Sequence, residues 1–582
     1  MRSVVTGVDS LAVRAAEQLR HLGLAVTTAL SMAREDPALL VVHASRRLPR
    51  RWSEQFARAL RRIGRHPGSA ATAIGLWLEG RRAEARVAVR GALAHRPSPI
   101  VSEVAMELDA LDGTTTSAPA ATAARAAWRR GDVSGAIAAT PLGSALRTRL
   151  VAERSLMATG TSLGESRTTR SPRAAGTPSS LHLLTNSLPH TTSGYALRSH
   201  AVLQAQQASG VRAAAVTRLG YPVSVGLVRS RDVEVVEGVA YHRLLPWRAA
   251  PTPDARLRQQ VSMTSRLVDE YHPNVLHTTT PFGNALVAEA VASQAGLPWV
   301  YEVRGLLEET WAASFPTPEA RAKARTSERH RLLRAREAEL AGRADRVIVL
   351  GETVRDDLVA RGVPAGAIVV VPNAVDASLL TVERAPAHAR QALGLPSEGF
   401  WVGTIGSLVD YEGAATLLDA VAILRARGVD VRVAVVGDGV CRPALQRQIA
   451  DRGLSGHAVL PGRVDGHRVI DWYLALDAFA VPRQDTTVTR MVTPLKPMQA
   501  MALGRPVIAS DLPALDEIVG RPGAGILVPP DDPSALADGI AGLMDDGALA
   551  GQLGSAGRDF AATRTWSKVG ALYRALYDGL AG

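Results

Sequence analysis

The chain has 582 residues, too many for one hydrophobic core, and this length predicts about three domains. Hydrophobic residues make up 46% and charged residues 21% of the chain, which is typical of globular proteins and excludes wholesale disorder. The single cysteine, Cys441, excludes a disulfide framework and a cysteine zinc cluster. No apolar run of about 18 residues predicts a membrane span, and residues 1–20 lack the apolar core of a signal peptide, so we expect a cytoplasmic protein.

The net charge of +12 is confined to the start of the chain. Residues 1–180 hold 26 arginines and 14 acidic residues, whereas the charges of the remaining residues cancel. Only three lysines occur, Lys323, Lys496 and Lys568, so the arginine excess indicates a GC-rich genome. A nucleic-acid binder is an alternative, but aromatic residues at 4% offer few stacking platforms, and we expect no nucleic acid as a partner.

Residues 1–157 are predicted to form a basic helical module. Apolar residues recur at helical spacing over 52–63, 74–78, 83–93 and from about Arg125. The segments around Trp77 and Trp128 share a Trp, a Gly turn and an Ala-rich second helix, a pattern that faintly resembles paired-helix repeats.

The same module carries a strongly basic stretch. Eight arginines fall within residues 46–66, part of the segment 45–66. On an amphipathic helix such a segment suits an anionic membrane surface, and a solvated helical face is the alternative. We therefore expect that the protein can lie peripherally at the inner face of the cell membrane.

Residues 158–180 are rich in Ser, Thr, Gly and Pro without apolar period, which predicts a flexible linker, with an ordered surface loop as the alternative. Short β-rich runs then alternate with amphipathic stretches at 195–209, 283–295 and 318–343, the pattern of a parallel sheet covered on both faces. The pattern restarts once, so we predict two doubly wound α/β domains, 181–385 and 396–560, and a C-terminal helix within 561–582 that packs back on them. The predicted strands are 181–185, 211–216, 275–278, 299–303, 347–350 and 368–371, then 401–404, 431–436, 459–460, 478–481, 507–509 and 526–528.

Ligands of such sheets bind at the carboxyl ends of the strands, so the residues that follow each strand are candidates. Gly194 opens the helix after the first strand, where backbone N–H groups can approach an anion; a simple turn is the alternative. Glu302, Arg304 and Glu308 lie at the end of the strand 299–303 and could contact hydroxyls or phosphate; a structural ion pair is the alternative.

The second domain has its densest polar segment at 481–502. It predicts a strand, a polar loop and a helix with Thr493 as N-cap and Pro494 as first residue. Lys496 in the first turn and Arg483 in the loop would form a diphosphate clamp, and solvated charges are the alternative.

Several segments resemble family 4 (group 1) glycosyltransferases, of the branch found near bacterial exopolysaccharide export systems. They are Thr493-Pro-Leu-Lys496-Pro-Met-Gln499-Ala-Met-Ala-Leu-Gly504, Ser187-Leu-Pro-His-Thr-Thr-Ser-Gly194-Tyr-Ala-Leu-Arg198, Tyr301-Glu-Val-Arg304-Gly305 and Val371-Pro-Asn373-Ala-Val-Asp376. The resemblance covers about 180–560 and implies a GT-B fold, with two Rossmann-like domains facing a cleft. It also implies retaining, metal-independent transfer from a nucleotide-sugar donor to a polysaccharide or lipid-linked acceptor, with no other cofactor.

The resemblance assigns roles to the candidate residues. Arg483 and Lys496 would stabilise the charge of the leaving diphosphate as catalytic residues, and Arg304 and Glu308 would lie near the reacting sugar or acceptor. No metal ligand is implied. The implied donor-binding residues are Gly194, Gly406, Ser407, Gly437, Asp438, Gly439, Val464, Thr493, Pro494, Leu495 and Gln499.

The sequence also departs from the family pattern. Where the family places two glutamates eight residues apart, this chain has Met491 and Gln499, and an amide accepts hydrogen bonds from a ribose without charge assistance. The usual Arg and Lys are missing from 406–413. A catalytically degenerate scaffold is therefore the alternative function. His190 and His467 show no metal-ligand spacing and are interpreted as structural.

Overall fold

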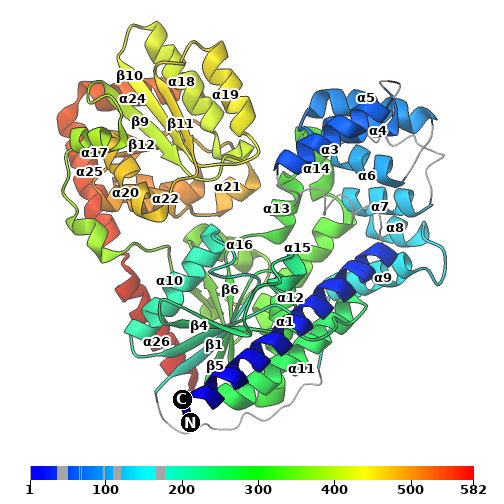
Figure 1. Cartoon of the computed structure of the whole chain (residues 1–582). Helices are drawn as coiled ribbons and strands as arrows, with labels where there is room; N and C mark the ends of the chain where they lie inside the picture. The colour runs from blue at the N-terminus through cyan, green and yellow to red at the C-terminus, as the bar shows by residue number, and fades with distance from the viewer. Residues whose placement is uncertain are drawn as a thin grey trace.

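The chain folds into two α/β domains, one above the other, with a helical module standing beside them, as the computed structural model shows (Figure 1). This arrangement confirms the predicted fold class of a helical region followed by two parallel-sheet domains. The structure describes residues 2–35, 50–64, 66, 68–95, 99–108, 120–164, 177–315 and 317–581.

Short helices joined by tight turns form the helical module. Ser69 and Ser144 cap two of them by accepting a hydrogen bond from the backbone N–H three residues later. Gly80 (φ 76°) and Gly131 (φ 89°) turn the chain between successive helices in the left-handed region that favours glycine. The helices are α1 (Arg2–Glu35), α3 (Arg50–Ile63), α4 (Ala70–Leu78), α5 (Arg82–His95), α6 (Pro99–Glu107), α7 (Ala120–Arg130), α8 (Val133–Ala138) and α9 (Ala145–Met157).

The long helix α1 runs along the first α/β domain, in dark blue in Figure 1. Leu24 is fully buried against Val223 and Leu245, and Arg20 forms an ion pair with Asp232. The first helix thus belongs, by its contacts, to the surface of the first α/β domain.

The first α/β domain is built on an eight-stranded sheet with the order β3-β4-β2-β1-β5-β6-β7-β8, parallel except for β3. All predicted strands of this domain form. Its strands are β1 (Ser179–Leu184), β2 (Arg212–Thr217), β3 (Val233–Val236), β4 (Val239–Arg243), β5 (Val275–Thr279), β6 (Trp299–Val303), β7 (Arg346–Val349) and β8 (Ile368–Val370). Its helices are α10 (Gly194–Ala208), α11 (Pro253–Tyr271), α12 (Phe282–Ala295), α13 (Leu307–Ala313), α14 (Pro318–Arg325), α15 (Glu328–Arg343) and α16 (Glu352–Ala360).

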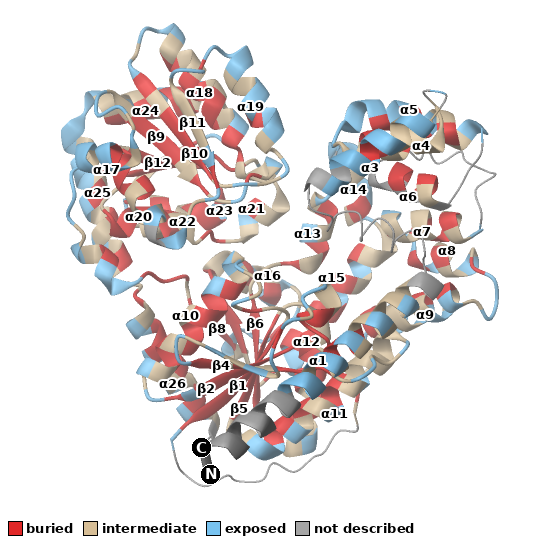
Figure 2. Ribbon diagram, viewed as in Figure 1, coloured by how far each residue is buried: buried red, intermediate tan, exposed pale blue. Residues whose placement is uncertain are grey.

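The second α/β domain has a fully parallel six-stranded sheet with the order β11-β10-β9-β12-β13-β14. Most of its strand residues are buried, because helices cover both faces of the sheet (Figure 2). The strands are β9 (Phe400–Ile405), β10 (Val431–Val436), β11 (Ala458–Gly462), β12 (Ala478–Val481), β13 (Val507–Ser510) and β14 (Gly525–Val528). The helices are α17 (Pro386–Leu393), α18 (Ala414–Ala426), α19 (Arg442–Asp451), α20 (Gly466–Ala475), α21 (Thr487–Met491), α22 (Lys496–Ala502), α23 (Pro513–Leu515), α24 (Pro533–Asp545) and α25 (Gly547–Ala562).

The last helix, α26 (Trp566–Ala581), returns to the first α/β domain. Its Tyr573 and Tyr577 are buried in a cluster with valines of β5 and β6 and with Val202 of α10. The two segments that cross between the domains are bonded to each other, since Val375 N–H donates to Arg564 O (2.9 Å) and Trp566 N–H donates to Val375 O (3.1 Å).

Three local expectations need correction. The hairpin β3–β4 was not predicted, although Glu237 and Gly238, both at positive φ, make its two-residue turn. The predicted helix 318–343 is two helices, since Ser327 caps α15. Residues 158–164 of the predicted linker are ordered: Leu163 is buried, and Gly160 N–H donates to Glu339 (2.8 Å). Residues 165–176 of that linker lie outside the described part of the chain.

Candidate active site

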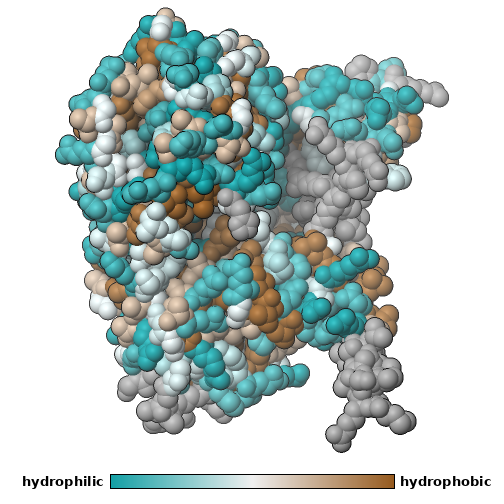
Figure 3. All heavy atoms as spheres, turned by 60° about the vertical axis from the view of Figure 1, so that its left-hand side comes forward, coloured by the Kyte–Doolittle hydropathy of each residue, from teal (hydrophilic) through white to brown (hydrophobic). Residues whose placement is uncertain are grey.

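A cavity of about 540 Å³ opens between the two α/β domains. In Figure 3 hydrophobic atoms gather along the waist where these domains meet. The first domain provides most of the wall and the segment 492–495 of the second domain provides the rest. The lining residues are Gly194, Tyr195, Arg198, Thr280, Pro281, Arg304, Gly305, Leu306, Leu307, Thr310, Leu350, Asn373, Val492, Thr493 and Leu495.

The structure brings four of the predicted site residues into this wall: Gly194, Arg304, Thr493 and Leu495. Gly194 is the first residue of α10, which Ser193 caps by accepting from Ala196 N–H (3.2 Å). The start of α10 therefore borders the cavity, as the turn after the first strand predicts.

Glu302 is the buried anchor of two arginines in the cavity wall. Its carboxylate accepts from Arg198 Nη2 (2.9 Å) and Arg304 Nη2 (2.8 Å), and its side chain has no solvent exposure. Burial alone would raise the pKa of Glu302, but Arg304 and Arg198 outweigh it and hold that pKa well below its usual range. Arg198 also donates to Asn373 Oδ1 (3.1 Å). Arg304 thus forms a structural ion pair with Glu302 and also lines the cavity.

The C-terminal helix extends this buried network. Tyr577 Oη of α26 hydrogen-bonds His277 Nδ1 (2.8 Å), and His277 Nε2 lies 3.2 Å from Glu302. His277 stacks on His182 with ring centres 4.2 Å apart, and burial lowers the pKa of both rings. His277 thus contacts the same Glu302 oxygen, Oε2, that accepts from Arg304, and the network links α26 to the cavity wall.

Glu308 does not reach the cavity. Its side chain is fully buried in an ion pair with Arg361 (2.7 Å) and is absent from the cavity lining. Because Glu308 belongs to α13 but faces the domain interior, its predicted contact with the reacting sugar is wrong for this structure.

Two cations of the second domain flank the lining segment. Arg483 Nη1 donates to Val492 O (2.8 Å), and its Nη2 and Nε donate to the Glu412 carboxylate at 2.7 and 3.1 Å. Burial lowers the pKa of Lys496, and the charge of Glu412 opposes this shift. Arg483 and Lys496 thus share one acidic neighbour, which the sequence did not predict.

The helix that carries Lys496 begins later than predicted. Helix α22 starts at Lys496 with Leu495 as N-cap and Pro497 in its first turn, so Thr493 is not the N-cap and Pro494 precedes the helix. Thr493 Oγ1 has no hydrogen-bond partner among the described residues, while Thr493 O accepts from Asn373 Nδ2 (3.1 Å). A hydrogen bond thus joins the segment 493–495 of the second domain to Asn373 of the first.

The predicted nucleotide-side residues cluster at the carboxyl ends of β9, β10 and β11. A Cβ on Gly437 would lie 1.8 Å from Gly406 O, so only glycine allows this approach of the two loops. Leu408 N–H, next to Ser407, donates to Asp438 O (3.0 Å), and a Cβ on Gly439 would collide with Leu408 O. Gly437 N–H donates to Gly462 O (2.9 Å), two residues before Val464.

The two positions where the family carries glutamates behave differently from each other. Gln499 Oε1 accepts from Tyr473 Oη (3.0 Å), and burial raises the pKa of Tyr473. Met491 is partly buried and packs against the core of the first α/β domain. One substitution thus keeps an acceptor, and the other replaces a charge by an apolar contact between domains.

Sequence reasoning missed Tyr195, Arg198, Asn373 and Glu412 as site residues, although each lies within a segment or motif that it singled out. The sequence signal that could have identified two of them is a charged or amide side chain among apolar neighbours, such as Arg198 in α10 and Asn373 after β8. His190, predicted to be structural, pairs with Glu234 (2.8 Å).

In the part of the chain that the structure describes, no three His, Cys, Asp or Glu side chains converge as a metal site. Within the same residues, no helix has the length and hydropathy needed to cross a membrane.

Comparison with known proteins relates each α/β domain to a family. Residues 193–374 match the family model "Glycosyl transferase 4-like domain", and residues 399–546 match "Glycosyl transferases group 1". The lipopolysaccharide core biosynthesis mannosyltransferase LpsB of Rhizobium meliloti is 30% identical over 32% of this chain and 55% of its own length. The phosphatidyl-myo-inositol mannosyltransferase of Mycolicibacterium smegmatis is 30% identical over 37% of this chain and 52% of its own length. The chain thus spans about half the length of these relatives.

Solved structures share the fold. Sucrose-phosphate synthase from Thermosynechococcus elongatus superposes with a TM-score of 0.56 at 22% identity, covering 69% of this chain and 98% of the other. Anabaena HepE in complex with UDP gives a TM-score of 0.54 at 18% identity, covering 69% of this chain and all of the other. Residues 193–374 thus match a glycosyltransferase 4-like domain and residues 399–546 a group 1 glycosyltransferase domain, and the two domains together have the GT-B fold.

Proposed function

We propose that the chain is a glycosyltransferase that moves a sugar, with retention and without a metal ion, from a nucleotide-sugar donor to a polysaccharide or lipid-linked acceptor. The observation that carries the proposal is the position of Arg483 and Lys496, which flank the cavity-lining segment 492–495 between the domains. The family matches of both domains support it.

The charge of the leaving group explains why cations belong there. As the bond between sugar and diphosphate breaks, negative charge grows on the phosphate oxygens, and fixed positive groups in a partly dry site stabilise it most. Arg483 and Lys496 would supply this charge, with Gly406, Ser407 and 437–439 on the nucleotide side. The UDP complex of the related fold supports a nucleoside diphosphate sugar as donor.

The first domain would bind the acceptor. Its cavity wall is mostly apolar, with the arginines held by Glu302 as its polar part. Relatives named for lipopolysaccharide core and phosphatidylinositol support a lipid-linked acceptor. Docking of the helical module on an anionic membrane, through the basic segment 45–66, would bring such an acceptor within reach. Residues 45–49 and 65 of this segment lie outside the described residues.

A thermal-shift screen of nucleotide sugars tests the proposal, because a bound donor raises the melting temperature. The donor found is then used in turnover assays with lipid and glycan acceptors. Lys496→Ala should lower turnover roughly 100-fold or more, the usual effect of removing a group that stabilises developing charge. Lys568→Ala is the control and should leave turnover unchanged. The Nζ of Lys568 donates to Ala562 O (3.0 Å), and Lys568 is not among the residues that line the cavity. Full turnover by Lys496→Ala would refute the assignment.

One observation favours a second candidate, the degenerate scaffold. Arg483 already donates hydrogen bonds to the Glu412 carboxylate and to Val492 O. The negative charge of Glu412 therefore partly neutralises the proposed diphosphate clamp of Arg483 and Lys496. A wild-type chain that binds a nucleotide sugar but neither hydrolyses nor transfers it would support this scaffold and reject the enzyme.

A further inference from the structure

Helix α13 stands between the helical module and the candidate active site. Leu307 and Thr310 of α13 line the cavity, and the helix also contacts α21 of the second domain. In Figure 1 α21 lies on one side of α13, and α14 and the helical module lie on the other. Helix α13 thus links the helical module, the cavity wall and the second domain by direct contacts.

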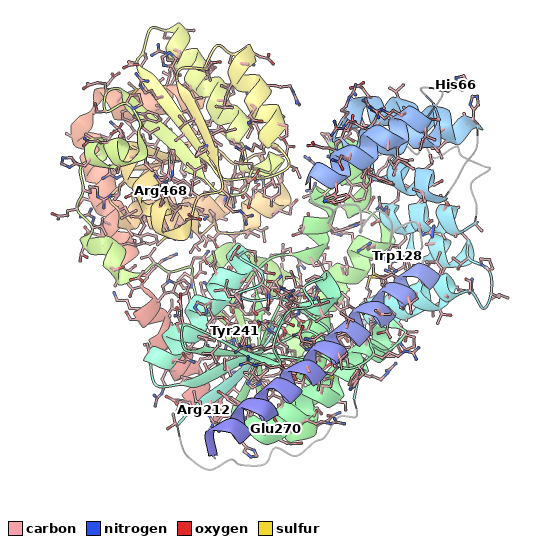
Figure 4. All side chains as sticks on the ribbon, viewed as in Figure 1. His66, Trp128, Arg212, Tyr241, Glu270 and Arg468 are labelled. Carbon is pink, nitrogen blue, oxygen red and sulfur yellow. The ribbon has the colours of Figure 1, made fainter. Side chains whose placement is uncertain are left out.

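The helical module contacts α13 through cation–π interactions of one arginine, Arg329, with a tryptophan of each. The Arg329 guanidinium of α15 lies 5.0 Å from the ring centre of Trp311 in α13 and 5.8 Å from that of Trp128 in α7. Figure 4 shows Trp128 where the module meets the first α/β domain. Burial lowers the pKa of Arg329, and a desolvated guanidinium between aromatic faces makes a strong contact.

Backbone contacts reinforce this interaction. A Cβ on Gly131, after α7, would lie 2.7 Å from the Trp311 ring and 2.3 Å from Ser327 Oγ, so the turn lies directly on both. Gly131 O accepts from Arg329 N–H (3.0 Å). Ser134 of α8 donates from its N–H (2.6 Å) and its Oγ (2.8 Å) to the Glu328 carboxylate.

We propose that the helical module is a positioning element of the acceptor-binding wall, and that Trp128, through Arg329 and Trp311, fixes the place of α13. The mechanical part needs only the contacts above, whereas the kinetic consequence rests on the proposed function. Loss of the Trp128 ring would leave Arg329 with one aromatic face and free Trp311 to move, so that Leu307 and Thr310 no longer hold their places in the wall.

Hydrogen exchange of the full chain, read by mass spectrometry, tests the mechanical part. Trp128→Ala should speed exchange of the segment 306–315 roughly 10-fold, and Trp128→Phe, which keeps an aromatic face, should restore most of the protection. Trp77→Ala removes a tryptophan that packs within α4–α6 and should leave 306–315 unchanged. If Trp128→Ala unfolds the module, Arg329→Gln tests the same contact by removing the cation that both rings share. Unchanged exchange of 306–315 in Trp128→Ala or Arg329→Gln overturns the proposal.

A kinetic measurement tests the consequence for the site, with UDP-glucose as donor and phosphatidylinositol vesicles as acceptor. Trp128→Ala should raise KM for the acceptor roughly 10-fold, with kcat and KM for the donor within twofold of wild type, and Trp128→Phe should recover the wild-type KM. An unchanged acceptor KM in a variant whose α13 exchanges faster overturns the positioning role. If the wild-type chain turns over none of the nucleotide sugars of the thermal-shift screen with lipid or glycan acceptors, the proposed function is rejected instead, and the exchange measurement still tests the contact between the module and α13.

Discussion

At the donor side of the cavity, Glu412 accepts two hydrogen bonds from the guanidinium of Arg483 that a phosphate would otherwise receive. The charge of the Glu412 carboxylate also acts on the buried amine of Lys496, whose pKa it raises against the effect of burial. The positive charge offered to a diphosphate is therefore smaller than the two cations suggest. No signal in the sequence pairs residue 412 with residue 483, because the pairing depends on how two loops meet at the ends of β9 and β12.

Glu412→Gln should strengthen the binding of UDP, because it removes a negative charge beside the phosphates while keeping an acceptor for Arg483. A gain of roughly 1 kcal/mol, or about fivefold in Kd, is expected and can be measured by titration calorimetry. Asp410→Asn, which removes a more exposed carboxylate of the same loop, should change Kd less than twofold. Weaker binding by Glu412→Gln would instead mean that Glu412 positions Arg483 for the phosphate.

Glu337 is the residue whose titration should be visible in the stability of the protein. Burial raises its pKa to about 7, and its carboxylate accepts from Tyr301 Oη and from Phe282 N–H (2.8 Å). Since the folded state then holds a proton that the unfolded state has lost, stability should fall as the pH rises from about 4.5 to about 7. The slope from this group is at most about 1.4 kcal/mol per pH unit.

Glu337→Gln should flatten that slope, because the amide cannot ionise; its oxygen can accept from Phe282 N–H, and its nitrogen can donate to Tyr301 Oη. Urea unfolding at several pH values between 5 and 8 measures the effect. A variant with the same slope as wild type would show that Glu337 titrates near its usual value.

At the scale of elements, the β-strands were predictable and several boundaries were not. The twelve strands that the sequence predicts all form, because continuous Val, Ile and Ala runs buried on both faces leave a strong pattern. The hairpin β3–β4 escaped prediction because it lacks a continuous buried run: no residue of the edge strand β3 is buried, and in β4 buried residues alternate with partly exposed ones. The start of α22 was misplaced by two residues, since Leu495 and not Thr493 is the N-cap. The backbone carbonyl of Thr493 instead accepts from Asn373 of the other domain, a tertiary contact without a local signal.

Helix α3 presents an apolar face to solvent, and this face supports the proposed contact with a membrane. The exposed fractions of Trp52, Phe56 and Ile63 are 56%, 51% and 71%, and these residues lie on one face of the helix at spacings of four and seven. The side chains of Arg58 and Arg62 are exposed beside them. Such a face suits insertion between anionic headgroups.

The triple variant Trp52→Ala, Phe56→Ala, Ile63→Ala should lose binding to phosphatidylglycerol vesicles in a flotation assay. Each side chain contributes roughly 1.5–3 kcal/mol when it leaves water, so the loss should exceed about 100-fold. The control is Leu142→Ala, which removes another exposed apolar residue (86%) of the same module and should float like wild type. Equal flotation with and without anionic lipid for the wild-type chain would reject the membrane contact.

At the scale of the whole molecule, Glu517 links the two α/β domains. Its carboxylate, from the second domain, accepts from the N–H groups of Glu352 (2.9 Å) and Thr353 (2.6 Å) at the start of α16 in the first. An acidic group at a helix N-terminus from another domain acts as a latch, because it satisfies free donors only while the domains are close.

Glu517→Ala should shift the molecule toward a more open arrangement, since the loss of such a cap costs roughly 1–2 kcal/mol, about 10-fold in the equilibrium between closed and open forms. Small-angle X-ray scattering should show a larger radius of gyration. Asp516→Asn changes a carboxylate that bonds Arg521 within its own domain (3.0 Å) and should leave the scattering unchanged. Identical scattering of Glu517→Ala and wild type would rule out the latch.

The return of α26 to the first α/β domain sets an order for the synthesis of the protein. Until the ribosome has made α26, Val202, Val275, Val300 and Ile348 lack the tyrosines that cover them, so the first α/β domain is finished only after the second has been made. A nascent chain stalled after residue 565 would therefore display this uncovered face to chaperones and proteases.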